Sequence, residues 1–130
     1  MPVWAFDLDG TLIGSIRNDR LRPGARELLA GLAERGVTCV LWSAGGAAYA
    51  ERKARQHGIA DSFAAFYAKA ERDHDQRYRV DHFAPEHLPD VFVDDSPRDV
   101  TSGARVIRVP QFMGGNDADR GLRDLLELLP

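Results

Sequence analysis

Short runs of hydrophobic residues recur along the chain, and each has the length of a buried strand. They cover residues 3–6, 37–42, 63–68, 91–93 and 105–109. Apolar runs of this length, rich in β-branched and aromatic residues and followed by polar residues or proline, are typical of strands inside a sheet. The pattern therefore predicts five strands.

Helical signals lie between and after these runs. Helices are expected over residues 23–35, 47–57 and 119–129. The first begins with Pro23 and stops before Gly36, which are common residues at the start and just past the end of a helix. Ser96 and Pro97 predict one further short helix. Residues 69–82 are dense in charge and show no period, so a loop or an irregular helix is expected there.

Strands that alternate with helices predict the α/β class: a parallel sheet with helices on both faces, in a doubly wound, Rossmann-like arrangement. With 130 residues and neither an internal repeat nor a change of composition, the chain is expected to form one domain over residues 1–130. In such sheets, ligands bind beyond the carboxyl ends of the strands. Candidate chemistry is therefore sought where the apolar runs end.

Aspartates follow two of the apolar runs. Asp7 and Asp9 come after the first run, and Asp94 and Asp95 come after the fourth. The fold would gather these four carboxylates at one edge, where they would repel one another unless a hard cation neutralised them. Mg²⁺ prefers oxygen ligands and also bridges to phosphate, so it is the expected cofactor.

A phosphate-binding loop is expected after the second apolar run. The hydroxyl of Ser43 and the backbone amides of Ala44 and Gly45 would contact phosphate oxygens there. A cation would complete such a site. Of the 17 basic residues only Lys53 and Lys69 are lysines, and Lys69 directly follows the third run.

Composition and charge exclude several other classes of protein. The formal net charge is −3 with both signs interspersed, which implies no general attraction to nucleic acid or to an anionic membrane. Cys39 is the single cysteine, so a disulfide framework is excluded. No apolar stretch approaches the roughly 20 residues that span a bilayer, and a cytoplasmic location is expected.

The motifs resemble those of the haloacid dehalogenase-like (HAD) phosphohydrolases. Residues 6–12, FDLDGTL, are similar to the first motif of that family, residues 41–43 to the second and residues 91–97, VFVDDSP, to the fourth. Lys69 is similar to the third motif in its order and approximate spacing. Four other cations stay open as alternatives for that position: Lys53, Arg72, Arg77 and Arg79.

The resemblance implies a phosphomonoester phosphatase. Asp7 would attack phosphorus and form an aspartyl-phosphate, and Asp9 would act as general acid and then as general base. Mg²⁺ would be held by the Asp7 side chain, the Asp9 carbonyl and Asp95, with Asp94 as a ligand either directly or through water. Thr11, Ser43, Ala44 and Lys69 would bind the phosphate, while Gly10 and Asp99 would support the surrounding loops.

The intervals between the motifs are too short for the inserted cap domains that select substrates in many relatives. The chain therefore resembles capless members, and the expected substrate is a small or macromolecular phosphoester at an open site. Two alternatives stay open: a catalytically silent metal- or phosphate-binding scaffold of the same fold, and a phosphatase for nucleic-acid 3'-phosphate ends. The second rests on arginines and Tyr78 within residues 72–82, but interleaved acids favour a solvated, ion-paired loop instead. The sequence does not predict the oligomeric state.

Overall fold

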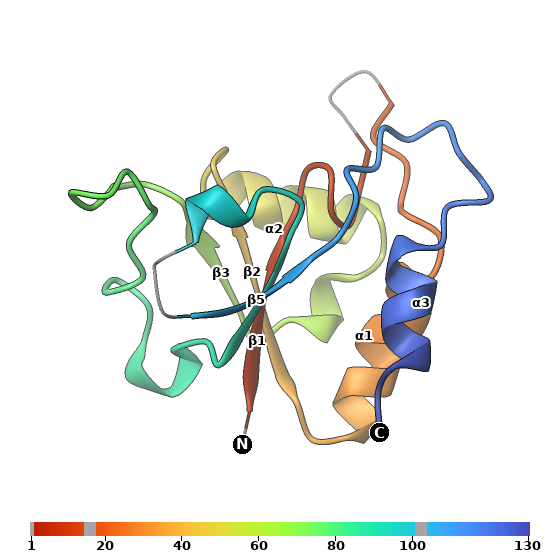
Figure 1. The fold of residues 1–130 in the computed structure, drawn as a ribbon, viewed down its shortest axis with the longest axis horizontal. Coiled ribbons are helices and arrows are strands. Elements are labelled where there is room, and N and C mark those ends of the chain that lie inside the picture. The colour runs from red at the N-terminus through yellow and green to blue at the C-terminus, as the bar shows by residue number, and fades with distance from the viewer. Residues whose placement is uncertain (1, 15–17, 101–103) are drawn as a thin grey trace.

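The computed structural model describes residues 2–14, 18–100 and 104–130, and these form one five-stranded parallel sheet (Figure 1). The strand order is β3-β2-β1-β4-β5. The strands are β1 (Val3–Asp7), β2 (Thr38–Ser43), β3 (Ala65–Ala68), β4 (Val91–Asp94) and β5 (Arg105–Arg108). All four pairings are parallel, so the carboxyl ends of the strands lie at one edge. The predicted α/β class is thereby confirmed.

The helices also follow the predicted order. They are α1 (Ala25–Glu34), α2 (Ala47–Gln56) and α3 (Gly121–Glu127), and the short helix predicted at Pro97 is the 3-10 turn η3 (Pro97–Asp99). Two further 3-10 turns are η1 (Ala60–Ser62) and η2 (Pro85–His87). No inserted domain interrupts the sheet in the described residues. None of the helices described is long and apolar enough to cross a membrane.

All three α-helices pack on the same face of the sheet. Leu28 and Leu32 of α1, Ala50 of α2 and Leu122 of α3 share one buried cluster with Phe6 of β1. In Figure 1, α1 and α3 lie beside each other on this side. The helical layer is continuous because the chain returns to it after β5.

The opposite face is covered by irregular chain, although helices were expected on both faces. Phe83, Tyr78 and Val80 from the segment between β3 and β4 pack against Trp42 and Phe92 of the sheet. This segment contains one 3-10 turn, η2, and otherwise no helix. It is dense in charge and lacks apolar residues at helical spacing, so it buries a few aromatic anchors instead of a helix face.

A buried ion pair joins the loop after β1 to the start of α3. The Arg22 guanidinium is fully buried and donates to both carboxylate oxygens of Asp119, at 2.6 and 3.0 Å. Its remaining nitrogen donates to the carbonyls of Gly10 and Thr11, at 3.4 and 3.2 Å. The guanidinium thus holds the first-motif loop in place through backbone atoms.

Removing the partner of this buried cation should strongly destabilise the protein. Asp119→Ala leaves the Arg22 charge uncompensated, and we expect a loss of about 3–5 kcal/mol in the free energy of unfolding, measured in urea. Asp117→Ala removes the exposed ion pair with Arg20 and serves as control, with an expected loss of about 0–1 kcal/mol. Equal losses in the two variants would show that the buried pair does not anchor the loop.

Candidate active site

The carboxyl ends of the strands bring the predicted site residues to one edge of the sheet. Asp7 ends β1, Ser43 ends β2 and Asp94 ends β4, while Lys69 directly follows β3. In the strand register Asp7 pairs with Trp42, the residue before Ser43. Four strands therefore each contribute one polar residue to this edge.

Lys69 lies between two of the carboxylates. Its Nζ donates to Asp7 Oδ1 at 2.9 Å and to Asp94 Oδ2 at 3.0 Å, and Asp99 Oδ2 lies 3.6 Å away. The ammonium also sits 4.9 Å from the centre of the Trp42 ring. Lys69 is 6% exposed, so its charge acts within a largely desolvated cluster.

The other candidate cations are engaged elsewhere. Lys53 pairs with Asp19 at 2.6 Å, and Arg79 pairs with Asp81 at 2.7 Å. Arg77 donates to the carbonyls of Pro97 and Val100. Arg72 stacks on Tyr78 and lies 3.8 Å from Asp99. Within the described residues, Lys69 is the candidate cation that contacts Asp7.

Thr11 connects the first and fourth motifs. Its hydroxyl lies 3.0 Å from Asp7 Oδ2 and 3.2 Å from Asp95 Oδ1, and it accepts a hydrogen bond from the Asp95 amide at 3.1 Å. Predicted as a phosphate ligand, Thr11 is here fully buried with its hydroxyl between two carboxylates. The Thr11 hydroxyl therefore fixes the distance between the carboxylates of Asp7 and Asp95.

Gly10 supports the same contact through its lack of a side chain. Its φ angle is +83°, a left-handed conformation that residues with a Cβ adopt at a cost. A Cβ at this position would lie 2.6 Å from Asp95 Oδ2. The glycine therefore lets the backbone turn and leaves room for the Asp95 carboxylate.

Negative charge exceeds positive charge in this cluster. Carboxylate oxygens of Asp7, Asp94 and Asp95 lie within 4.8 Å of one another, and Lys69 is the ammonium that contacts two of them. Burial raises the pKa of Asp7 well above its usual value, and the Asp94 charge raises it further against the opposing effect of Lys69. Burial likewise raises the pKa of Asp94.

A divalent cation would relieve this excess charge, and the donors fit it. The three side chains offer hard oxygen atoms close together, which is the ligand type that Mg²⁺ takes. Both oxygens of Asp94 already accept hydrogen bonds, from Lys69 and from the Ser96 amide. The Oδ2 atom of Asp95 receives none from the described residues, so Asp95 is the better placed direct ligand.

Asp9 lies outside this three-carboxylate group. Its Oδ1 accepts a hydrogen bond from the Tyr49 hydroxyl at 3.1 Å. Partial burial raises the pKa of Asp9, and the Tyr49 hydrogen bond opposes that effect. A carboxyl group with a raised pKa, beside the acidic cluster but apart from it, is suited to proton transfer.

The loop after β2 is folded around Ser43. The Gly45 amide donates to Ser43 Oγ at 3.0 Å, so the hydroxyl proton stays available for a ligand. The Ser43 carbonyl accepts from the amides of Gly46 and Lys69, which ties this loop to the end of β3. Ala44 is exposed.

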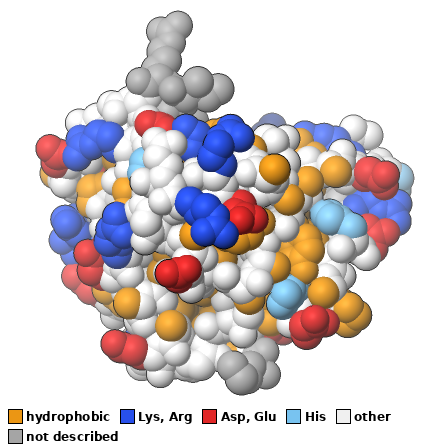
Figure 2. Space-filling view, turned by 180° about the vertical axis from the view of Figure 1, so that it is seen from behind, with side chains coloured by type: hydrophobic (Ala, Val, Ile, Leu, Met, Phe, Trp, Pro, Cys, Tyr) orange, Lys and Arg blue, Asp and Glu red, His pale blue; other side chains and the backbone are white. Residues whose placement is uncertain are grey.

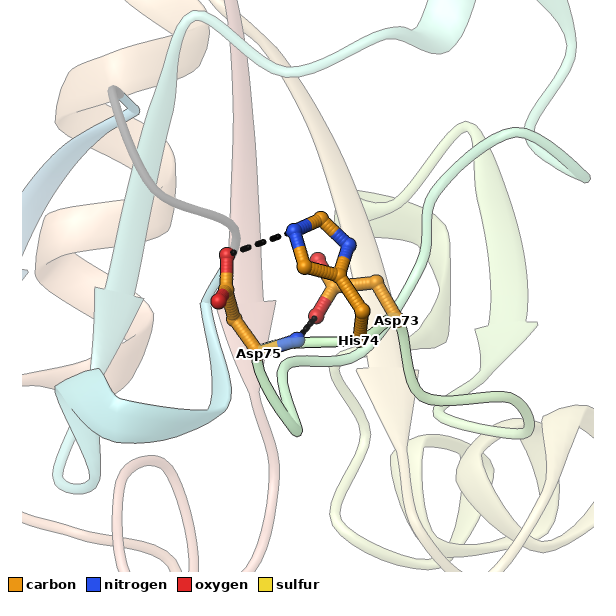
Figure 3. A group of neighbouring side chains, drawn as sticks. All are labelled: Asp73, His74 and Asp75. Atoms are coloured by element: carbon orange, nitrogen blue, oxygen red, sulfur yellow. Dashed lines mark hydrogen bonds and ion pairs between the residues drawn. The ribbon is translucent and has the colours of Figure 1, made fainter.

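A second group of potential ligands, Asp73, His74 and Asp75, lies on an exposed turn (Figure 3). Asp73 Oδ1 accepts hydrogen bonds from the amides of Asp75 and Arg77, and His74 points toward Asp75. This carboxylate is thus used to close the turn. The geometry is that of a solvated loop, in line with the sequence interpretation.

Basic and acidic side chains also lie close together on the surface of the protein. Figure 2 shows basic and acidic side chains interspersed over one face of the molecule. Beside Asp99, a hollow of about 490 Å³ is lined by three arginines, Arg72, Arg77 and Arg98, and also by Asp75. Arg72 and Arg77 already donate hydrogen bonds within the protein, and Asp75 and Asp99 add negative charge to the lining of this hollow.

The comparisons with known proteins agree with this geometry. Residues 3–130 match the family of NLI interacting factor-like phosphatases (NIF). The chain belongs to this HAD-like phosphatase family and is therefore a phosphatase, as the sequence motifs predicted. No significant match was found among curated protein sequences.

Solved structures share the fold at low sequence identity. A protein of uncharacterized function from Listeria monocytogenes serotype 4b is 17% identical, with a TM-score of 0.67, over 98% of this chain and 96% of that one. The core domain of a candidate phosphoglycolate phosphatase from Streptococcus pneumoniae TIGR4 is 21% identical, with a TM-score of 0.57, over 98% and 93% of the two chains. At these identities the likeness shows the fold.

Sequence reasoning missed two residues at this site. Tyr49 contacts Asp9 from the first turn of α2, and Arg22 holds the loop that carries Gly10. The position of Tyr49 just after the Ser43 loop was a usable signal, because a first-turn side chain lies near the strand ends. The sequence around Arg22 carries no such signal, because its partner, Asp119, is 97 residues away.

Replacing Gly10 should separate the backbone requirement from the contact with Asp95. Gly10→Ala and Gly36→Ala both place a Cβ on a left-handed residue, at a cost of about 1–2 kcal/mol in folding free energy. Only Gly10→Ala also pushes on Asp95, because no atom lies within 4 Å of a Cβ at Gly36. We expect kcat/KM for a phosphoester to fall about 10–100-fold in Gly10→Ala and to stay near wild type in Gly36→Ala. Unchanged turnover in Gly10→Ala would argue against a functional role of Asp95.

Proposed function

We propose that this phosphatase is magnesium-dependent and hydrolyses phosphomonoesters through an aspartyl-phosphate on Asp7. The single observation that carries the proposal is the position of the Asp7 carboxylate between Lys69 and Thr11, with Asp94 and Asp95 beside it. A carboxylate held on both oxygens, next to a cation and a candidate metal site, is oriented for attack on a bound phosphoryl group.

The metal would be held by Asp7, by the Asp9 carbonyl and by Asp95, with Asp94 as a further ligand or as a partner of a bound water. When bound, Mg²⁺ would supply positive charge to the phosphoryl oxygens and offset the repulsion among the carboxylates. Thr11 and Gly10 would keep the first- and fourth-motif carboxylates at the separation described above. Asp99 would help to hold Lys69, whose Nζ lies 3.6 Å from its carboxylate.

The substrate phosphate would be bound by donors from two loops. The Ser43 hydroxyl and the Ala44 amide would contact its oxygens from the end of β2. Lys69 would stabilise the negative charge that these oxygens carry during transfer, while its own charge favours the ionised form of Asp7 and its hydrogen bond orients that carboxylate. Both loops are joined through the Ser43 carbonyl and the Lys69 amide, at 2.9 Å.

Two steps would complete the reaction. In the first, an Asp7 oxygen forms a bond to phosphorus, the bond from phosphorus to the leaving oxygen breaks, and protonated Asp9 gives its proton to that oxygen. In the second, water attacks phosphorus, ionised Asp9 takes a proton from it, and the bond between phosphorus and Asp7 breaks. Asp7 returns as a carboxylate and Asp9 returns protonated, so each turnover consumes one ester and one water.

The open edge of the sheet supports a proposal for the substrate class. In the described residues no inserted domain covers the strand ends, which supports a substrate whose leaving group extends beyond the site. We propose phosphomonoesters that are exposed on a small molecule or on a macromolecule. A scaffold role without turnover is less consistent with the desolvated Lys69–Asp7 contact, and nucleic-acid ends are less consistent with the paired arginines.

Magnesium removal and replacement of the nucleophile should have the same effect. Phosphate release from an aryl phosphate should cease in EDTA and return when Mg²⁺ is added. Asp7→Asn should lower kcat by at least roughly a thousandfold. Asp75→Asn, in the exposed second group of potential ligands, is the control and should keep both turnover and Mg²⁺ dependence. Retained turnover in Asp7→Asn, or its loss in Asp75→Asn, would contradict the assignment.

A further inference from the structure

We propose that Tyr49 is a positioning residue for Asp9: its hydroxyl holds one carboxylate oxygen so that the other faces the leaving group. The inference rests on the proposed function, in which Asp9 is the general acid. It assigns a role to a residue outside the four motifs. Tyr49 would act through Asp9 and would not itself touch the substrate.

The contact joins two elements that are distant in sequence. Asp9 belongs to the loop after β1, and Tyr49 lies 40 residues further on, in the first turn of α2. The distance from the Tyr49 hydroxyl to Asp9 Oδ1 is 3.1 Å. Both residues are partly buried at the strand ends, so the hydrogen bond is shielded from bulk water and yet borders the open site.

The ring of Tyr49 is held on several sides. A Cβ at Gly45 would lie 2.5 Å from its Cδ2 atom, so the absence of a side chain there leaves the space that the ring fills. The Arg52 guanidinium and the Lys53 ammonium lie 5.4 and 5.9 Å from the ring centre. A ring fixed in this way presents its hydroxyl in one direction.

The chemistry of a phenol suits this role. A tyrosine hydroxyl is protonated at neutral pH, so at 3.1 Å from Asp9 Oδ1 it acts as the hydrogen-bond donor. Asp9 Oδ1 is therefore the acceptor, and the proton that Asp9 delivers is carried by Oδ2. In the first step this proton passes from Oδ2 to the leaving oxygen as the ester bond breaks. Tyr49 exchanges no proton.

Comparing two leaving groups tests the role of Tyr49, because a purely structural role would affect both substrates equally. An alkyl phosphate needs a proton on its departing oxygen, whereas an activated aryl phosphate leaves without one. Because kcat/KM reports the steps up to leaving-group departure, it isolates the general-acid step from the later hydrolysis. We therefore compare kcat/KM for one alkyl and one aryl phosphate in Tyr49→Phe, which keeps the ring beside Gly45 and removes only the hydroxyl.

We expect Tyr49→Phe to lose about tenfold or more in kcat/KM for the alkyl phosphate and to keep kcat/KM for the aryl phosphate. Tyr67→Phe is the matched control: its hydroxyl contacts His87 at 2.7 Å and the Ala84 amide at 3.1 Å, away from Asp9, and both substrates should react as in wild type. Melting temperatures of the two variants establish that each is folded.

Asp9→Asn, measured with the same pair of substrates, separates the role of Tyr49 from the general-acid role of Asp9. If it discriminates against the alkyl phosphate but Tyr49→Phe loses on both substrates equally or on neither, the role of Tyr49 is wrong and the proposed function stands. If Asp9→Asn shows no such discrimination, the general-acid assignment fails, and the inference fails with it.

Discussion

The contact of Lys69 with Asp7 and Asp94 is the interaction on which this site depends. Two almost completely buried carboxylates at neighbouring strand ends would repel each other, and the buried ammonium between them offsets part of that repulsion. A third carboxylate, on Asp95, leaves the cluster negative and thus receptive to a divalent cation. Repulsion among these carboxylates lowers the stability of the metal-free protein, and a bound metal would reduce that repulsion.

The fold makes this arrangement possible through strand order. With β1 at the centre of the sheet, β4 on one side and β2 followed by β3 on the other, the four strand ends lie in one row. The residue after β3 can then reach across the sheet to the ends of β1 and β4. Two residues fix the local geometry of the loop after β1. Arg22 donates hydrogen bonds to the carbonyls of this loop, and the Thr11 hydroxyl lies between the carboxylates of Asp7 and Asp95.

Much of this could be predicted from the sequence, because it depends on local patterns. Apolar runs followed by Asp7, Ser43 and Asp94 indicate strand ends at one edge, and alternating helices indicate a parallel sheet. The scarcity of lysine pointed to Lys69 without excluding Lys53 or the arginines. The irregular chain on the second face could not be predicted in the same way, because Phe83 becomes buried, and Tyr78 partly buried, only when the sheet is present. Contacts such as Arg22 with Asp119 are set by tertiary packing between distant segments, for which a single sequence carries no periodic signal.

The most direct test of the account is chemical trapping of the aspartyl-phosphate on Asp7. Asp9→Asn should form this intermediate from an aryl phosphate in the presence of Mg²⁺ and hydrolyse it slowly, because the general base is missing. Denaturation followed by borohydride reduction converts an acyl phosphate to an alcohol, so mass spectrometry of the N-terminal peptide should find homoserine at position 7. Rapid release of the aryl alcohol with an unmodified Asp7, or with the reduced residue at another position, would contradict the central claim.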